Sequence, residues 1–125
     1  MILDTNAISD WWDNEPSLIT ILGTATRLYV PVPALAELHF GVLQSRKRSE
    51  MLEWMTQALS SIDILNVDEK TTRHYAELRL ALKQNGTPIP MNDLWIAAIA
   101  RQHRLPLLSR DTHFELVPDL TRISW

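Results

Sequence analysis

Four acidic residues stand where a folded chain could use them for chemistry. Asp4 and Asp111 each follow a short apolar run that predicts a strand, Asp93 lies at the start of an apolar helical run, and Glu37 lies beside the apolar stripe of another predicted helix. If the fold gathers them within about 4 to 6 Å, each close pair of charges costs on the order of 4 kcal/mol at an effective dielectric constant near 20. Bound protons or a divalent cation must then compensate.

Oxygen ligands favour a hard cation, so the sequence predicts a Mg²⁺ or Mn²⁺ site. Such an ion would make a bound water easier to deprotonate and would neutralise charge on phosphoryl oxygens, which is the chemistry of phosphodiester hydrolysis. We expect Asp4 and Asp93 to be the direct metal ligands. Glu37 would bind the ion through water or orient the nucleophile, and Asp111 would hold a second ion.

Three of these acids also have purely structural interpretations. Asp4 precedes a predicted helix and would serve as its N-cap. Asp93 near a helix N-terminus is favoured by the helix dipole, and Asp111 resembles a turn or cap residue. Glu37, between Ala36 and Leu38, has no such explanation. The argument for a site therefore depends on their joint placement.

Composition limits the classes of protein to consider. The chain has 125 residues, a formal net charge of −3 and no cysteine, which excludes disulfides and sulfur-ligated zinc and agrees with a reducing compartment. Its four histidines lack the close pairing of a helical zinc motif. No stretch approaches the roughly 18 apolar residues needed to cross a membrane, and Met1-Ile2-Leu3-Asp4 lacks the basic start and apolar core of a signal peptide. We expect one cytoplasmic domain over residues 1–125.

The negative charge argues at first against a nucleic-acid partner. Bound cations would offset it, however, and basic residues are grouped locally. The run from Arg46 to Arg48 would steer RNA toward the acidic site, or would simply be a solvated helix start. The adjacent Trp11 and Trp12 cannot both be buried equally in a helix, so one would stack on a base or dock a partner, unless both pack in the core or in a dimer.

The order of expected elements indicates an α/β fold around a mainly parallel sheet. Apolar runs predict strands and amphipathic runs predict helices, and no hairpin dipeptides separate the strands. Ligands of such sheets bind beyond the carboxyl ends of the strands, where Asp4 and Asp111 lie. The expected strands are 1–4, 28–32, 62–67, 106–108 and 121–125; the expected helices are 5–12, 16–26, one from Pro33, 46–60, one capped by Asp68 and stopping at Asn85-Gly86, and one capped by Asn92, with a helical turn around His113 and Phe114.

Four segments, taken in order, resemble the PIN domain, and within it the VapC-type toxins of bacterial toxin–antitoxin pairs. The resemblance covers essentially the whole chain. No single segment is diagnostic, but their order and separations are specific. The segments are Leu3-Asp4-Thr5-Asn6, Ala36-Glu37-Leu38 with Gly41, Asn92-Asp93-Leu94-Trp95-Ile96-Ala97-Ala98, and Leu108-Ser109-Arg110-Asp111 with His113-Phe114.

The resemblance implies an α/β/α sandwich and a Mg²⁺- or Mn²⁺-dependent endoribonuclease that is dimeric and inhibited by a cognate antitoxin, with which it binds operator DNA. It places Asp4, Glu37, Asp93 and Asp111 on the acidic quartet. Asn6 and Ser109 fall on the supporting polar positions. The fourth acidic position varies in the family, which bears on the second-metal role of Asp111, and His113 is treated as a packing or turn residue.

Two other functions remain open at the level of sequence. The chain could be the catalytically weak, PIN-like half of a DNA-binding complex whose partner reads the operator, with a vestigial acidic site. A general Mg²⁺-dependent DNA nuclease or phosphatase would use the same ligands. Comparing RNA, single-stranded DNA and a small phosphoester in one assay separates these hypotheses.

Overall fold

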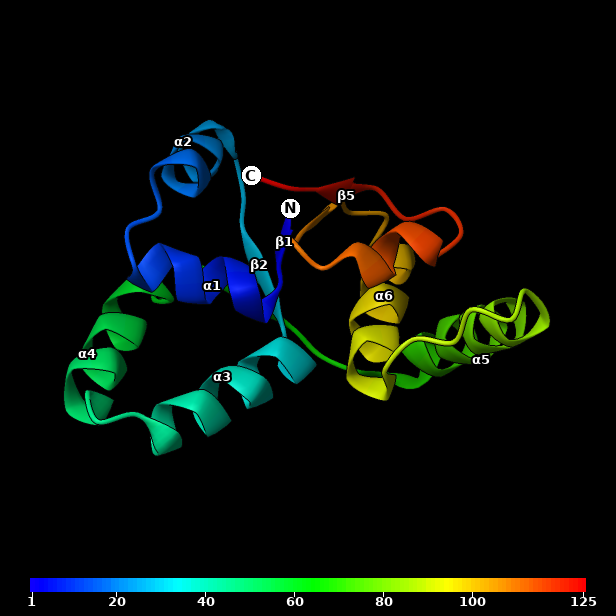
Figure 1. The fold of residues 1–125 in the computed structure, drawn as a ribbon, viewed down its shortest axis with the longest axis horizontal. Helices are drawn as coiled ribbons and strands as arrows, with labels where there is room; N and C mark the ends of the chain where they lie inside the picture. The colour runs from blue at the N-terminus through cyan, green and yellow to red at the C-terminus, as the bar shows by residue number, and fades with distance from the viewer.

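The computed structural model describes residues 1–125 and shows a parallel five-stranded sheet between two layers of helices. In Figure 1, α1 to α4 lie on one side of the sheet and α5 and α6 on the other. The α/β/α sandwich with a parallel sheet is thereby confirmed. In chain order the elements are β1 (Ile2–Leu3), α1 (Thr5–Trp12), α2 (Pro16–Thr24), β2 (Tyr29–Pro31), α3 (Val32–Gln44), α4 (Arg48–Ala58), β3 (Asp63–Leu65), α5 (Glu69–Gln84), α6 (Met91–His103), β4 (Leu107–Leu108), the 3₁₀ turn η1 (Thr112–Leu116) and β5 (Arg122–Ile123).

The order of strands across the sheet is β3-β2-β1-β4-β5. The chain therefore adds β2 and β3 on one side of β1 and then returns to add β4 and β5 on the other. The crevice between β1 and β4, where the direction of winding reverses, is the place where ligands bind in open parallel sheets. Asp4 follows β1 directly and Ser109 follows β4 directly, so both lie at this crevice.

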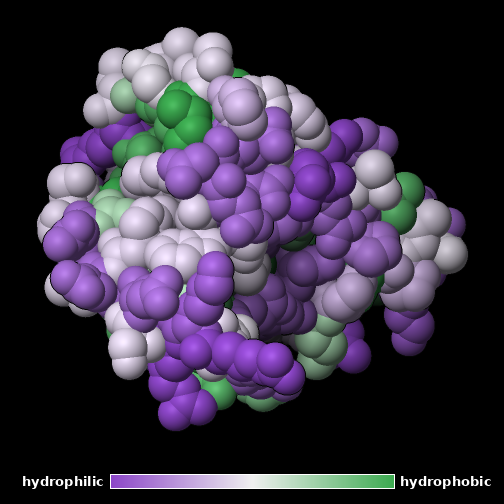
Figure 2. Space-filling view, turned by 60° about the vertical axis from the view of Figure 1, so that its left-hand side comes forward, coloured by the Kyte–Doolittle hydropathy of each residue, from purple (hydrophilic) through white to green (hydrophobic).

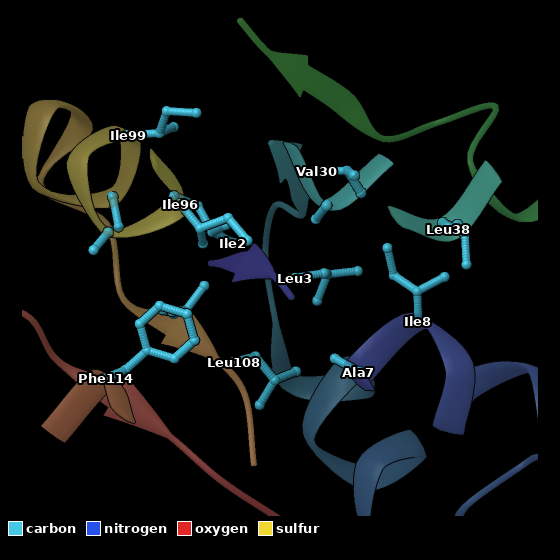
Figure 3. Packing of buried hydrophobic residues seen from close by; sticks show 14 of the residues in the cluster. Ile2, Leu3, Ala7, Ile8, Val30, Leu38, Ile96, Ile99, Leu108 and Phe114 are labelled. Atoms are coloured by element: carbon cyan, nitrogen blue, oxygen red, sulfur yellow. The ribbon is translucent and has the colours of Figure 1, made fainter. Parts of the chain in front are cut away.

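The hydrophobic core packs on both faces of β1. In Figure 3, Ile2 lies beside Ile96 of α6, whereas Leu3 lies on the side of Ile8 and Leu38. All five of these aliphatic side chains are buried, and those of Ile2, Leu3, Ile8 and Ile96 are fully buried. Successive strand residues point to opposite faces, so a strand of only two residues is enough to fasten one helical layer to each face. This packing fixes the position at which Asp4 leaves the sheet.

Local sequence accounts for most helix boundaries. Asp68 caps α5 through a capping box in which its side chain accepts from the Thr71 amide and the Thr71 hydroxyl accepts from the Asp68 amide. Gly86, just after α5, has a φ of +69°, a conformation that glycine adopts without steric cost. No helix is both long and apolar enough to pass through a membrane. On the face seen in Figure 2, hydrophobic side chains surface only as separate small areas among hydrophilic ones.

Three helix starts differ from the expectation: α3 begins at Val32 instead of Pro33, α4 begins at Arg48 instead of residue 46, and α6 begins at Met91. The prediction that Asn92 caps α6 is wrong, because the N-cap position belongs to Pro90 and no side chain caps this helix. Asn92 lies within the first turn, and its amide nitrogen bonds the carbonyl of Pro33, 3.3 Å away, and the carboxylate of Glu37. The Asn92 side chain therefore forms hydrogen bonds with α3 instead of capping its own helix.

Candidate active site

The four acidic residues come together in one cavity of about 500 Å³. Asp4 lies at the start of α1, Glu37 on α3, Asp93 in the first turn of α6, and Asp111 just before η1. No hydrophobic residue lines this cavity, and Figure 2 shows a recess bordered mainly by hydrophilic side chains. The fold thus brings together four acidic residues that belong to separate parts of the sequence. The cavity walls also include Thr5, Asn6, Ser9, Asp10, Pro90, Asn92, Arg110 and His113.

Asp4 is buried, with 4% of its surface exposed, and both of its oxygens are held. Its Oδ1 accepts the Thr5 amide at 2.8 Å, which makes Asp4 the N-cap of α1. Its Oδ2 accepts the Ser109 hydroxyl at 2.6 Å and lies 3.3 Å from the amide nitrogen of Asn6. The cap and the site therefore use different oxygens of one carboxylate.

Ser109 and Asn6 join the ends of β1 and β4. The Ser109 hydroxyl is fully buried and accepts the Asn6 side-chain amide at 3.2 Å and the Asp111 backbone amide at 3.0 Å. The side-chain Oδ1 of Asn6 accepts a hydrogen bond from the Arg110 backbone amide at 3.2 Å. Because these bonds cross the crevice between the two strands, they fix Asp4 and Asp111 relative to one another.

Glu37 is exposed but restrained from both sides. Its Oε2 accepts the hydroxyl of Thr5 at 2.6 Å, and its Oε1 accepts the side-chain amide of Asn92. Thr5 belongs to α1 and Asn92 to α6, so two helices on opposite faces of the sheet hold one carboxylate of α3. The sequence offered no local signal for either partner.

His113 lies beside two of the acids. Its ring Nδ1 is 3.0 Å from Asp111 Oδ1 and 3.4 Å from Asp93 Oδ2. Donor atoms of Asp93, Asp111 and His113 all lie within 4.8 Å of one another, a spacing that could hold a metal ion. His113 thus belongs to the wall of the site, although sequence reasoning had left it out.

Burial and mutual repulsion raise the pKa values of two of the acids. The pKa of Asp93 rises to about 6, first because burial disfavours its charged form, then because Asp111 and Asp4 repel that charge. Burial likewise raises the pKa of Asp4, against the hydrogen bonds from Ser109 and Thr5, which lower it. A cluster with these properties gains from binding a positive charge.

The chain also matches known proteins along its length. The family model of the PIN domain matches residues 1–120. This chain belongs to the PIN-domain family. Ribonuclease VapC2 of Rickettsia felis is 31% identical over 129 residues, covering 99% of this chain and 96% of the relative. Toxin FitB of Neisseria gonorrhoeae is 31% identical, covering 90% of this chain and 88% of FitB. This PIN domain is therefore similar, over nearly its whole length, to a protein named as a VapC ribonuclease.

Solved structures agree with this PIN-domain assignment. The chain superposes on the crystal structure of VapBC2 from Rickettsia felis bound to a DNA fragment from its promoter with a TM-score of 0.88 and 29% identity, over 99% of this chain and 97% of the other. For FitAcB from Neisseria gonorrhoeae the TM-score is 0.85 at 30% identity, with coverage of 98% and 95%.

One positively charged side chain in the PIN-domain cavity, that of Arg110, was not predicted from the sequence. Arg110 is the only lysine or arginine that lines it. Its Nη2 lies 3.1 Å from both oxygens of Asp10, and its guanidinium carbon is 5.5 Å from the centre of the Trp125 ring. The Trp125 indole in turn donates to Asp10 at 2.9 Å. Asp10 and Trp125 therefore hold a positive charge at the edge of an acidic cavity.

Proposed function

We propose that this chain is the toxin of a toxin–antitoxin pair and hydrolyses RNA phosphodiester bonds. The observation that carries the proposal is the convergence of Asp4, Glu37, Asp93 and Asp111 on one polar cavity at the crevice between β1 and β4. Membership of the PIN-domain family and relatives named VapC ribonucleases support it.

The donor set fits a hard divalent cation. Five carboxylates line the cavity, and burial together with mutual repulsion raises the pKa values of Asp4 and Asp93, so a bound cation would be favoured there. We assign Asp4 and Asp93 as the ligands of Mg²⁺ or Mn²⁺, with Asp111 beside them. When bound, such an ion lowers the pKa of a water molecule and neutralises charge on phosphoryl oxygens.

Other residues of the cavity orient the acidic side chains or supply positive charge. Ser109 and Asn6 keep Asp4 in one orientation, which preserves the geometry needed for chemistry. Glu37, fixed by Thr5 and Asn92, is placed to orient a water molecule or accept its proton. Arg110 supplies the positive charge that an RNA phosphate needs on entering an otherwise acidic cavity.

The proposed partners follow from the relatives. One structure to which this chain is similar is a member of the VapBC family of toxin–antitoxin systems from Mycobacterium tuberculosis, and VapBC2 of Rickettsia felis was solved bound to a DNA fragment from its promoter. We propose that this chain forms a homodimer, is neutralised by a cognate antitoxin, and reaches operator DNA through that antitoxin. A small reading frame immediately upstream that encodes a DNA-binding domain would support the pairing.

Two charge-removing substitutions test the function. Asp4→Asn and Asp93→Asn should each abolish RNA cleavage and growth inhibition on induction, while circular dichroism shows an unchanged fold. Glu53→Gln, which removes one exposed carboxylate on α4, is the matched control and should cleave like wild type. Cleavage should require Mg²⁺ or Mn²⁺ and stop in excess EDTA.

Two outcomes would overturn the ribonuclease proposal. Cleavage that survives both substitutions, or that is undiminished in EDTA, would show that the acidic cavity does not perform the reaction. Wild-type protein that shifts operator DNA together with its partner, yet cleaves no RNA in a broad panel with Mn²⁺, would favour the catalytically weak subunit instead.

A further inference from the structure

A second cavity, of about 370 Å³, opens beside the acidic one. Thr5, Ser9 and Glu37 line both cavities, so the hydrogen bond between Thr5 and Glu37 lies in their common wall. The remaining wall of the second cavity comes from α1, α3 and α4, including Trp12 and Met51. A substrate whose reacting group lies among the carboxylates can therefore place its neighbouring group in the second cavity.

The walls of this second cavity suit a flat, uncharged group with polar edges. Trp12, Leu38 and Met51 provide aromatic and aliphatic surface, while Ser9 and Ser45 provide hydroxyl groups. Trp12 is half-buried and packs edge-on against Trp54, with ring centres 5.6 Å apart and planes at 77°. Stacking on an aromatic side chain is the sequence-tolerant way in which proteins hold the bases of single strands.

Charge decides which part of a nucleotide enters. The second cavity contains the acids Asp13 and Glu37 and no lysine or arginine. A phosphate would be repelled there, whereas a neutral base would not. Arg110, by contrast, lines the acidic cavity and not the second cavity. The phosphate is thus directed to the acidic cavity, where Arg110 and the divalent cation proposed above would offset the carboxylates, and the base is directed to the second cavity.

Gly41 leaves part of this space open. It lies on α3 in the cavity wall, and a Cβ atom built on it would meet no other atom within 4 Å. Its backbone is ordinary helix, so a side chain at this position in the cavity wall would meet open space and would not distort α3. Replacing glycine within a helix also raises helix propensity.

We propose that this second cavity, between Trp12, Gly41 and Met51, is a subsite for one base of the RNA, that of a nucleotide next to the phosphate held by the acidic cavity. The inference rests on the proposed ribonuclease function and adds to it a binding site for the base. Its occupant is covalently joined to the reacting phosphate, which accounts for the wall that the two cavities share.

Gly41→Leu tests the subsite by filling it, and Gly23→Leu is the matched control. Gly23 is also exposed on a helix, has no atom within 4 Å of a built Cβ, and lines neither cavity. Gly41→Leu should lower kcat/KM for RNA about 5- to 150-fold, the factor that loss of base stacking produces. Gly23→Leu should cleave like wild type, and both should fold as wild type does by circular dichroism.

RNA lacking a single base identifies the occupant. For wild-type protein, removing the base beside the cleaved bond on one side should reduce cleavage by a similar factor. Gly41→Leu should show no further reduction with that RNA, because the two changes remove the same interaction. Trp12→Phe, which keeps an aromatic ring, should lose less activity than Gly41→Leu.

The failures of the two proposals differ. Wild-type protein that cleaves no RNA overturns the ribonuclease function and this subsite with it. Wild-type cleavage that Gly41→Leu leaves unchanged overturns the subsite alone. So does a base-removal penalty that is equal in wild type and Gly41→Leu. If Gly41→Leu instead loses binding to the antitoxin and cleaves RNA normally, the cavity serves a protein partner.

Discussion

Asp93→Asn should stabilise the metal-free protein at neutral pH even though it should abolish activity. Asp93 has 15% of its side chain exposed, and its pKa in the fold is about 6 against an ordinary value of 3.8. Above pH 6 the Asp93 carboxylate is therefore ionised in both the folded and the unfolded state, and its charge is less favourable in the folded state. A difference from 3.8 to about 6 corresponds to about 3 kcal/mol at 1.36 kcal/mol per pKa unit.

The sign of this effect depends on pH. Below pH 3.8 both states of wild type are protonated at Asp93, so the substitution should change little. Between pH 3.8 and about 6 the folded state holds more protons than the unfolded state, and wild-type stability contributed by this group falls as pH rises. Above about pH 6 the full penalty is present. The stabilisation by Asp93→Asn should therefore grow between pH 3.8 and about 6 and reach its full size above pH 6.

Urea unfolding in EDTA, followed by tryptophan fluorescence, measures this gain. At about pH 7.5 the free energy of unfolding of Asp93→Asn should exceed that of wild type by on the order of 1 to 3 kcal/mol, and at about pH 4 most of the difference should disappear. Mg²⁺ should stabilise wild type more than the variant. Glu53→Gln controls for net charge. A gain that is independent of pH, or a loss of stability at neutral pH, would refute the reasoning.

Two further substitutions test the supports of the site. Ser109→Ala removes a buried hydroxyl that bonds Asp4, Asn6 and the Asp111 amide, and should lower the free energy of unfolding by about 1 to 3 kcal/mol; an unchanged urea midpoint would contradict the role of Ser109. Arg110→Ala should weaken RNA binding and reduce the slope of log affinity against log salt by about 0.7, the value for one phosphate contact to a single strand. A salt series measured by fluorescence anisotropy checks this, and parallel slopes would show that Arg110 does not contact phosphate.

The meeting of Asp4 with Asp111 could be predicted because it depends on features that a sequence displays locally. Each acid follows an apolar run that forms a strand, and parallel strands place their carboxyl ends at one edge of a sheet. The strands themselves are shorter than expected: 28–32 contracts to Tyr29–Pro31 and 62–67 to Asp63–Leu65. In the first case α3 begins at Val32, since proline at the next position favours the first turn of a helix.

The contacts that complete the site could not be predicted in this way. Asn92 and Glu37 are 55 residues apart in sequence, and Arg110 and Asp10 are 100 apart. Propensity and spacing describe neighbours along the chain, so Asn92 before an apolar helical run was interpreted as a cap. Only the packing of α3 against α6 reveals that its side chain has a better partner in Glu37. The local sequence likewise favours a packing or turn role for His113, because its partner Asp93 lies 20 residues away.

The structural and chemical interpretations of the acids prove compatible. Asp4 does cap α1 and Asp111 does cap η1, as the local sequence suggested, yet both line the acidic cavity. A carboxylate offers about four acceptor positions, and a backbone cap uses only one of them. The cap bond restricts rotation of the carboxylate and so aims the remaining oxygen, which in Asp4 faces Ser109 and Asn6. Capping at a strand end is therefore a way of orienting a ligand, and evidence for a cap does not weigh against a site.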